Sequence, residues 1–172
     1  VLPNRRLVAV SNQSTTSGGS GSVSVYLNRQ TDPSRTLTYG GSNVSGMGVA
    51  ISHQGDCYWS FNASASGGPG TIVKFAGCSG SGTEVVSGLP QVGGIIFDQS
   101  DNLYYIDRSY GVYKCQKTSK CLKLVQINGA INMNFDFKSK DIWLADTTGY
   151  ITEIVSPGKK SMQVFNFPSE GG

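Results

Sequence analysis

The sequence predicts an all-β protein in which a unit of four short antiparallel strands is repeated. Three segments of the 172-residue chain align: GVAISHQGDCYWSFN (48–62), GIIFDQSDNLYYIDR (94–108) and NMNFDFKSKDIWLAD (132–146). Each has an apolar run, a polar turn of about four residues and a second apolar run, which is the pattern of a β-hairpin. The 23 Gly and 23 Ser residues disfavour long helices. A period near 40 residues with four strands is typical of a β-propeller blade.

The remaining strands follow in order along the chain. Third strands are expected at 70–78, 111–117 and 149–156, and fourth strands at 83–87, 121–127 and 161–167. The N-terminal part fits as second, third and fourth strands at 4–12, 21–28 and 35–40, so the first blade lacks its innermost strand. Loops at 15–21 and 63–70 absorb the variation in repeat length. We therefore expect one domain, 1–172, with repeat units near 1–46, 47–92, 93–130 and 131–172 and fifteen strands.

The repeat favours a propeller of about four recognisable blades over a two-sheet sandwich, because a sandwich needs no self-similarity. First strands should lie nearest the propeller axis, where blades crowd, and small residues suit them: Gly48, Ala50, Gly93 and Gly94. Asn132 departs from this pattern. Large apolar side chains of the second strands are expected to pack between blades rather than to form a ligand platform.

Composition and charge argue against nucleic-acid binding and against a membrane-spanning helix. The net charge of +3 is spread over both halves of the chain, without the basic excess that binding to a nucleic acid requires. No apolar run is long enough for a membrane-spanning helix. The first residues lack the layout of a signal peptide and the chain does not begin with Met, so we expect a processed or truncated product.

The four cysteines predict two disulfides and hence an oxidising compartment. Cys57 opens a second strand and Cys78 closes the third, so the hairpin between them should bring the two together. Cys115 and Cys121 flank a five-residue turn, QKTSK, and can face one another across it. We expect the pairs Cys57–Cys78 and Cys115–Cys121, and a secreted, extracellular or cell-surface protein.

The repeat units resemble the NHL-like and gluconolactonase-like six-bladed propeller group, most closely at GGIIFDQSDNLYYIDRSYGVYKC (93–115). Secreted bacterial repeat proteins of this type often carry strings similar to GSVSVYLNRQTDPSRTLTYG (21–40). The resemblance implies the fold, and an exported protein. The sequence departs from the group in length, since about four units are present where the group usually has six.

The group includes lactonases with a divalent metal held by Glu, Asn and Asp in a central pocket. The corresponding candidates are Asp107 and Asp146 at the ends of second strands, with Asn12 and Asn62 at the equivalent positions. A polar residue at such a strand end more often accepts hydrogen bonds from the following turn, which we favour over metal binding. We expect no cofactor.

Other candidate sites have ordinary structural interpretations. The single histidine, His53, falls in a turn with no nucleophile or carboxylate placed beside it, and no catalytic motif occurs, so we assign no catalytic residue. Lys114, Lys117, Lys120 and Lys123 form the densest basic patch, which we read as protection of outer strands against aggregation rather than as a site for anions. N-glycosylation sequons occur at Asn12, Asn43 and Asn62, about as often as composition alone predicts.

These observations favour an extracellular, non-enzymatic β-propeller that acts as a binding or structural, self-assembling module. The alternative is a lactonase-like hydrolase or lyase with a central metal. Because the first blade is open, we expect either further blades in a longer chain or association between copies. A protein or a glycan is the expected ligand.

Overall fold

The computed structural model describes residues 7–13, 19–41, 43–64, 66–136 and 140–155, and the backbone of 161–166. These residues form fifteen strands in four antiparallel sheets, as predicted. The chain divides into two compact units, Val1–Val92 and Gly93–Gly172. Their border coincides with the predicted border between the second and third repeats.

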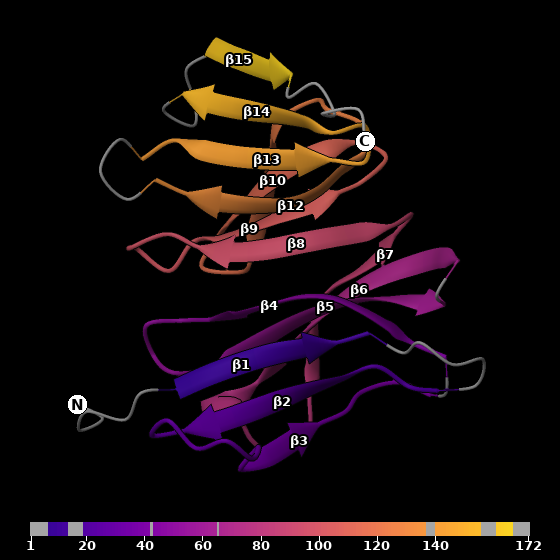
Figure 1. The fold of residues 1–172 in the computed structure, drawn as a ribbon, viewed down its shortest axis with the longest axis vertical. Coiled ribbons are helices and arrows are strands. Elements are labelled where there is room, and N and C mark those ends of the chain that lie inside the picture. The colour runs from indigo at the N-terminus through magenta and orange to yellow at the C-terminus, as the bar shows by residue number, and fades with distance from the viewer. Residues whose placement is uncertain are drawn as a thin grey trace, which may run out of the picture. The chain divides into compact units, whose positions relative to one another are not determined.

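The first unit contains a three-stranded sheet and a four-stranded sheet, each with its strands in chain order (Figure 1). The elements are β1 (Leu7–Asn12), β2 (Ser22–Leu27), β3 (Arg35–Leu37), β4 (Ser45–Ile51), β5 (Cys57–Ser64), β6 (Gly67–Phe75), the short 3-10 helix η1 (Ala76–Cys78) and β7 (Thr83–Leu89).

The core of the first unit lies between these two sheets and centres on Trp59, which is fully buried. Its indole Nε1 donates a hydrogen bond to Ser11 Oγ on β1 at 3.0 Å. Gly46 on β4 permits this close approach, because a Cβ there would lie 2.6 Å from Ser11 Oγ and 2.9 Å from Trp59 Nε1. The expected packing role of the second-strand aromatics is thus confirmed for Trp59.

The second unit contains two four-stranded sheets. The elements are β8 (Val92–Phe97), whose first residue belongs to the first unit, β9 (Leu103–Asp107), β10 (Gly111–Gln116), β11 (Lys120–Val125), β12 (Ala130–Phe135), β13 (Ile142–Asp146), β14 (Tyr150–Val155) and β15 (Ser161–Asn166). Figure 1 shows β12 to β15 side by side in this order.

Small residues on β8 permit close contact between the two sheets of the second unit. A Cβ on Gly93 would lie 2.7 Å from the carbonyl oxygen of Ile131, and one on Gly94 would lie 2.5 Å from Asn132 Oδ1. Both distances are too short for a real side chain. The glycines expected where first strands crowd therefore do lie at such a contact, and Asn132 is the larger residue on its other side.

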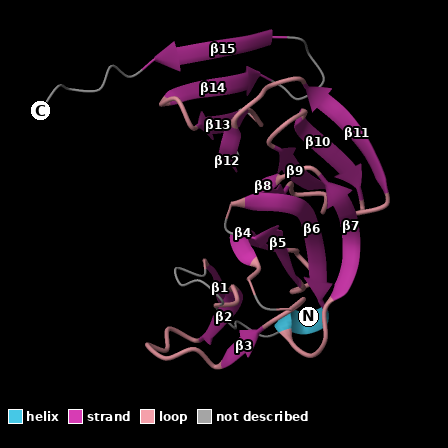
Figure 2. Ribbon diagram, turned by 90° about the vertical axis from the view of Figure 1, so that its right-hand side faces the viewer, coloured by secondary structure: helices cyan, strands magenta, loops and turns pink. Residues whose placement is uncertain are grey.

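Two local expectations are wrong. Residues 63–70 were expected to form a loop, but β5 extends to Ser64 and β6 begins at Gly67. The glycines that suggested a loop instead supply positive φ angles at the start of β6, with φ 112° at Gly67 and 109° at Gly68. The predicted third strand also ends early, because Ala76–Cys78 form η1 (cyan in Figure 2).

The two disulfides are present in the predicted pairing. Cys57–Cys78 joins the start of β5 to the end of η1, with an S–S distance of 2.00 Å. Cys115 and Cys121 are register partners on β10 and β11. Each disulfide therefore joins two segments of a single repeat.

Candidate functional site

A cleft of about 240 Å³ opens in the second unit between the β8–β9 turn and residues Phe135, Asp136 and Lys140. We call it the Lys114 cleft. Its lining combines acidic, basic and aromatic side chains: Asp98, Gln99, Ser100, Tyr104, Lys114, Phe135, Asp136 and Lys140. The site is therefore built from the same turn of two successive repeats.

Asp98 organises the β8–β9 turn. Its Oδ1 accepts hydrogen bonds from the backbone N–H groups of Ser100 and Asn102, both at 2.9 Å. Its Oδ2 accepts hydrogen bonds from Asn102 Nδ2 at 2.7 Å and from the Tyr104 hydroxyl at 3.2 Å. A side-chain oxygen that accepts hydrogen bonds from the N–H groups following it fixes such a turn, so the carboxylate is held rigidly.

Lys114 reaches the same carboxylate from β10. Its Nζ lies 3.5 Å from Asp98 Oδ2 and 5.1 Å from the centroid of the Tyr104 ring. Tyr104 and Lys114 are register partners on β9 and β10, which places their side chains next to each other on one face of the sheet. The Tyr104 ring in turn meets Phe135 edge to face, with centroids 4.9 Å apart.

The pKa values of Asp98 and of the ionisable groups around it are shifted further away from neutral pH. Burial tends to raise the pKa of Asp98, but the hydrogen bonds from Asn102 and Ser100 and the nearby Lys114 ammonium outweigh it, so the pKa is lowered. Burial raises the pKa of the Tyr104 hydroxyl. Burial tends to lower the pKa of Lys114, but Tyr104 and Asp98 outweigh it and the pKa is raised. At neutral pH Asp98 is negative, Lys114 is positive and Tyr104 is uncharged.

A second hollow, of about 380 Å³, continues from Lys114 toward the edge of the same sheet. We call it the outer groove. It is lined by Asn102, Lys114, Gln116, Lys120, Leu122 and Leu124. Leu122 is 72% exposed, the highest value among the large hydrophobic side chains that the structure describes. Lys114 lines both hollows. Together they form one surface, with charged residues in the Lys114 cleft and leucines in the outer groove.

The predicted basic patch is divided by the sheet. Lys114 faces the cleft and Lys120 lines the outer groove. Lys123 instead contacts the rings of Tyr110 and Tyr113, at 5.5 and 5.8 Å. Lys117 lies in the exposed β10–β11 turn. Only two of the four lysines therefore lie along the combined hollow.

The candidate metal ligands accept hydrogen bonds from their own turns. Asp107 Oδ1 accepts hydrogen bonds from the N–H groups of Ser109 and Tyr110, at 2.9 and 3.2 Å. Asp146 Oδ1 accepts hydrogen bonds from the N–H groups of Thr148 and Tyr150, at 2.8 and 3.1 Å. Among the described residues, no group of three or more His, Cys, Asp or Glu side chains could hold a metal. These oxygens do not form a metal-binding set with one another.

The asparagines at the positions equivalent to Asp107 and Asp146 have different hydrogen-bond partners from these aspartates. Asn62 is buried and binds both backbone groups of Val92, donating to its oxygen at 3.1 Å and accepting from its N–H at 2.8 Å. Asn12 donates to Ser22 and Ser24 of β2, at 3.1 and 2.9 Å. Of the three sequon asparagines, Asn43 is the exposed one. His53 is exposed in the β4–β5 turn, as expected.

Sequence reasoning did not single out the residues that form the cleft, apart from Lys114. Tyr104 was expected only to pack between blades, and no role was assigned to Asp98, Asp136 or Lys140. A signal was present, because a tyrosine pairs with a lysine at the same register in two repeats: Tyr58 with Lys74, and Tyr104 with Lys114.

Comparison with known proteins shows the fold. No protein-family model matches the chain, and no curated protein matches it. Among solved structures, it is similar to catalytically inactive virginiamycin B lyase from Staphylococcus aureus with quinupristin, with 14% identity, a TM-score of 0.61 and coverage of 96% of this chain and 61% of that one.

Two other solved structures are similar in the same way. The luciferin-regenerating enzyme has 14% identity and a TM-score of 0.64, over 96% of this chain and 60% of that one. YCF48 bound to D1 peptide has 12% identity and a TM-score of 0.54, over 86% of this chain and 50% of that one. The chain is a β-propeller of about four blades. It spans less than two thirds of the length of these neighbours.

Proposed function

We propose that this chain is an extracellular, non-enzymatic β-propeller that binds a protein partner in the Lys114 cleft. The observation that carries the proposal is the pair of charged groups that lines the cleft. The carboxylate of Asp98 is fixed by four hydrogen bonds, and the Lys114 ammonium lies 3.5 Å from it on a side chain that is 35% exposed. An exposed positive charge beside a fixed negative one suits recognition of a complementary charged ligand.

A protein partner and an extracellular location have separate supports. One structural neighbour, YCF48, is described as bound to D1 peptide, and such likeness supports a peptide-binding use of this fold without establishing it. The two disulfides are compatible with an oxidising compartment. In the part of the chain that is described, no helix is long and apolar enough to cross a membrane. Membership of the NHL-like group remains part of the proposal.

Unbiased peptide selection tests the proposal. A random peptide library is selected on residues 1–172 at neutral pH, and the selected peptides are measured by fluorescence anisotropy against wild type, Phe135→Ala and Lys114→Met. Lys117→Met is the matched control, because it removes the same charge in the exposed turn. We expect cleft variants to weaken binding about tenfold or more and the control to leave it unchanged. Peptides that bind all four proteins equally would refute the proposal.

A second candidate function is a lactonase-like hydrolase or lyase. Two structural neighbours are enzymes, a lyase and a luciferin-regenerating enzyme. Metal analysis of the purified chain, followed by assays on a panel of lactones with and without calcium, zinc or manganese, tests this candidate. Tightly bound stoichiometric metal together with turnover would favour it over the binding module.

We propose that copies of the chain associate through the first sheet. Among the described residues this sheet has three strands with β1 at its edge, and Val8 and Val10 on β1 are 54% and 43% exposed. Exposed apolar side chains on an edge strand favour coverage by another strand or another copy. Light scattering on residues 1–172 should show association, and Val8→Lys with Val10→Lys should abolish it. A wild-type monomer at all concentrations would contradict this part of the proposal.

A further inference from the structure

We propose that the Lys114 cleft and the outer groove together bind an extended acidic segment of a protein partner. One carboxylate of the segment binds at Lys114, and one apolar side chain packs on Leu122. This inference rests on the proposed function, because it specifies the chemistry of the partner bound by the same cleft.

Lys114 can bind a ligand without leaving Asp98 unsatisfied. Asp98 already accepts four hydrogen bonds, from two backbone N–H groups, Asn102 Nδ2 and the Tyr104 hydroxyl. The Lys114 ammonium adds a 3.5 Å ion pair and lies 5.1 Å from the Tyr104 ring centroid, and its side chain is 35% exposed. An exposed pair at this distance contributes little stability. The ammonium is therefore free to turn toward a carboxylate that enters the cleft, at little cost to the turn.

Lysines surround the entrance of the combined hollow. Lys140 lies on the β12–β13 side of the cleft and Lys120 in the outer groove. Neither makes an ion pair with a carboxylate within the described part of the chain. The combined lining holds three lysines, Lys114, Lys120 and Lys140, and two aspartates, Asp98 and Asp136, which gives it a formal charge of +1. This positive excess complements an acidic segment.

The apolar part of the surface lies one strand away from Lys114. Leu122 is the register partner of Lys114 on β11, so their side chains are neighbours on the same face. In an extended segment, residues i and i+2 point to the same side, about 7 Å apart. A glutamate and a leucine at this spacing can reach Lys114 and Leu122 together. We expect i, i+2 to be the preferred spacing.

The same surface is poorly suited to a sugar. Of the two aromatic residues in the cleft lining, Tyr104 is only 2% exposed, and Phe135 is half-buried and meets the Tyr104 ring edge to face, so little aromatic surface is open to a sugar ring. Leu122 and Leu124 offer aliphatic surface instead. The outer groove, at about 380 Å³, lies within the range of roughly 300–1,000 Å³ seen for ligand sites, and the Lys114 cleft, at about 240 Å³, lies just below it. A peptide segment fits the lining better than a glycan does.

A designed peptide set tests the inference. Fluorescein-labelled nine-residue peptides in a Gly-Ser background carry one Glu and one Leu, separated by none to four residues. Matched peptides carry Gln or Lys in place of Glu, or Ser in place of Leu. Binding is measured by anisotropy at low and high salt. We expect the i, i+2 peptide to bind about tenfold tighter than its Gln and Ser counterparts, with binding weakened by salt.

Protein variants locate the two contacts. Lys114→Met should remove the preference for Glu over Gln, and Lys114→Glu should bind the Lys peptide better than the Glu peptide. Leu122→Ser should remove the preference for Leu over Ser while leaving the preference for Glu. Lys117→Glu is the matched control and should bind as wild type does. Circular dichroism and intact mass with both disulfides confirm folding, and Lys114→Met serves where Lys114→Glu folds poorly.

The outcomes separate this inference from the proposed function. If library selection yields cleft-dependent peptides that lack the acidic and apolar pair, this inference is wrong and the proposed function stands. If neither peptide set depends on the cleft, both are wrong. Binding of an acidic oligosaccharide, such as an oligogalacturonate, at Lys114 with no binding of the Glu and Leu peptides would also overturn the inference in favour of a glycan.

Discussion

Each unit contains a paired tyrosine and lysine beside a turn aspartate, but the aspartate comes from opposite ends of the turn. Asp56 ends the β4–β5 turn, as Asn102 ends the β8–β9 turn, whereas Asp98 begins its turn. In the first unit Lys74 Nζ lies 2.6 Å from Asp56 Oδ2 and 5.8 Å from the Tyr58 ring centroid. In the second unit Lys114 Nζ lies 3.5 Å from Asp98 Oδ2 and 5.1 Å from the Tyr104 ring centroid. The lysine is thus closer to its carboxylate in the first unit and closer to its aromatic ring in the second.

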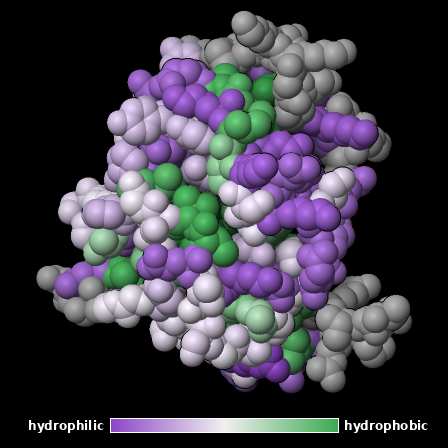
Figure 3. Space-filling model, turned by 180° about the vertical axis from the view of Figure 1, so that it is seen from behind, coloured by the Kyte–Doolittle hydropathy of each residue, from purple (hydrophilic) through white to green (hydrophobic). Residues whose placement is uncertain are grey.

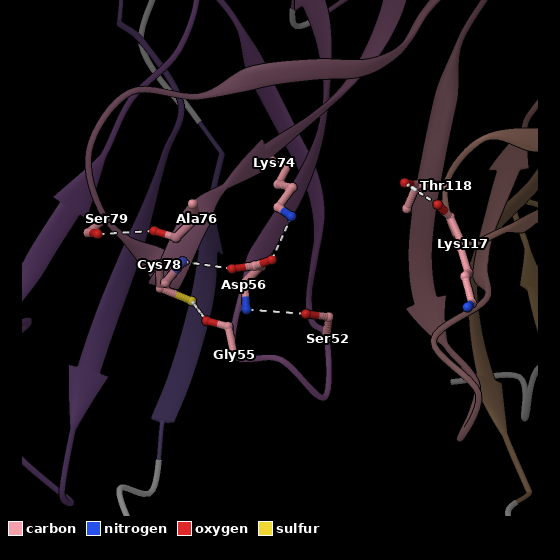
Figure 4. Close-up of polar contacts among 10 residues, drawn as sticks. Ser52, Gly55, Asp56, Lys74, Ala76, Cys78, Ser79, Lys117 and Thr118 are labelled. Atoms are coloured by element: carbon pink, nitrogen blue, oxygen red, sulfur yellow. Dashed lines mark hydrogen bonds and ion pairs between the residues drawn. The ribbon is translucent and has the colours of Figure 1, made fainter. Parts of the chain in front are cut away.

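The chain that follows the third strand also differs. After β6 the chain turns through η1, where the N–H of Gly77 donates to Asp56 Oδ1 at 2.8 Å and Cys78 is bonded to Cys57. Figure 4 shows Lys74 reaching the same Asp56 carboxylate. After β10 the chain makes the exposed β10–β11 turn at Lys117, and Asp98 is satisfied within its own turn instead. Because Asp98 is satisfied by hydrogen bonds from its own turn and from Tyr104, its lysine is the one that we propose binds a ligand.

The largest expected effect is loss of the Cys57–Cys78 disulfide. Replacing Cys57 and Cys78 by Ser should lower the free energy of unfolding by about 3 kcal/mol, because the bridge closes a loop with a sequence separation of 21. Replacing Cys115 and Cys121, with a separation of 6, should cost about 2 kcal/mol. Urea unfolding measures both. If loss of the Cys115–Cys121 bridge lowered the free energy of unfolding more than loss of Cys57–Cys78, the longer loop of Cys57–Cys78 would not be the source of greater stability.

Asp98→Asn tests the rigid β8–β9 turn. An amide cannot accept all four hydrogen bonds, so we expect a loss of about 1–3 kcal/mol in the free energy of unfolding. Because the folded-state pKa of Asp98 is lowered, its contribution is present above the ordinary aspartate pKa and is lost as pH falls through the lowered value. Asp98→Asn should therefore flatten the acid side of the stability profile. Asp32→Asn, in an exposed loop, is the control and should leave the profile unchanged.

Gly77→Ala should loosen the contacts of Asp56. Gly77 has φ 56°, a conformation that costs an alanine about 1 kcal/mol, and its N–H binds Asp56. Thermal unfolding should show a small loss of stability, with ligand binding at Lys114 unchanged. An unchanged melting temperature would mean that η1 tolerates the residue and does not restrain Asp56.

The smallest effect is the coupling within each ion pair. Double-mutant cycles with Lys74→Met and Asp56→Asn, and with Lys114→Met and Asp98→Asn, isolate the pairwise energies. Both lysines are about one third exposed, so we expect values within about 0.2–1 kcal/mol, larger for Lys74. A larger coupling at Lys114 would contradict its freedom to bind a ligand.

Surface hydrophobicity does not by itself point to either cluster. On the face shown in Figure 3, apolar surface is gathered in small areas between hydrophilic ones. Exposed large side chains occur in both units, among them Val8 and Leu122. What distinguishes Leu122 is its place beside Lys114 in the sheet, which the hydropathy of the surface cannot show.

Local pattern was sufficient for most of the fold. Alternating apolar residues and polar turns located all fifteen described strands, because strand and hairpin signals act over a few residues. The cysteine pairs followed from the same register. The exception at 63–70 has a clear cause: Gly67 and Gly68 read as a loop, but positive φ at these residues is compatible with the start of β6.

The sequence by itself determined the strands, their repeat and the disulfide pairs, all of which depend on residues near one another in the chain. Only the tertiary structure decided the site. Asp98 and Asp136, and Tyr104 and Phe135, come from successive repeats and meet only when the two sheets of the second unit pack. The environment of each turn aspartate also depends on segments apart in the sequence, because Gly77 of η1, two strands after Asp56, donates a hydrogen bond to its carboxylate.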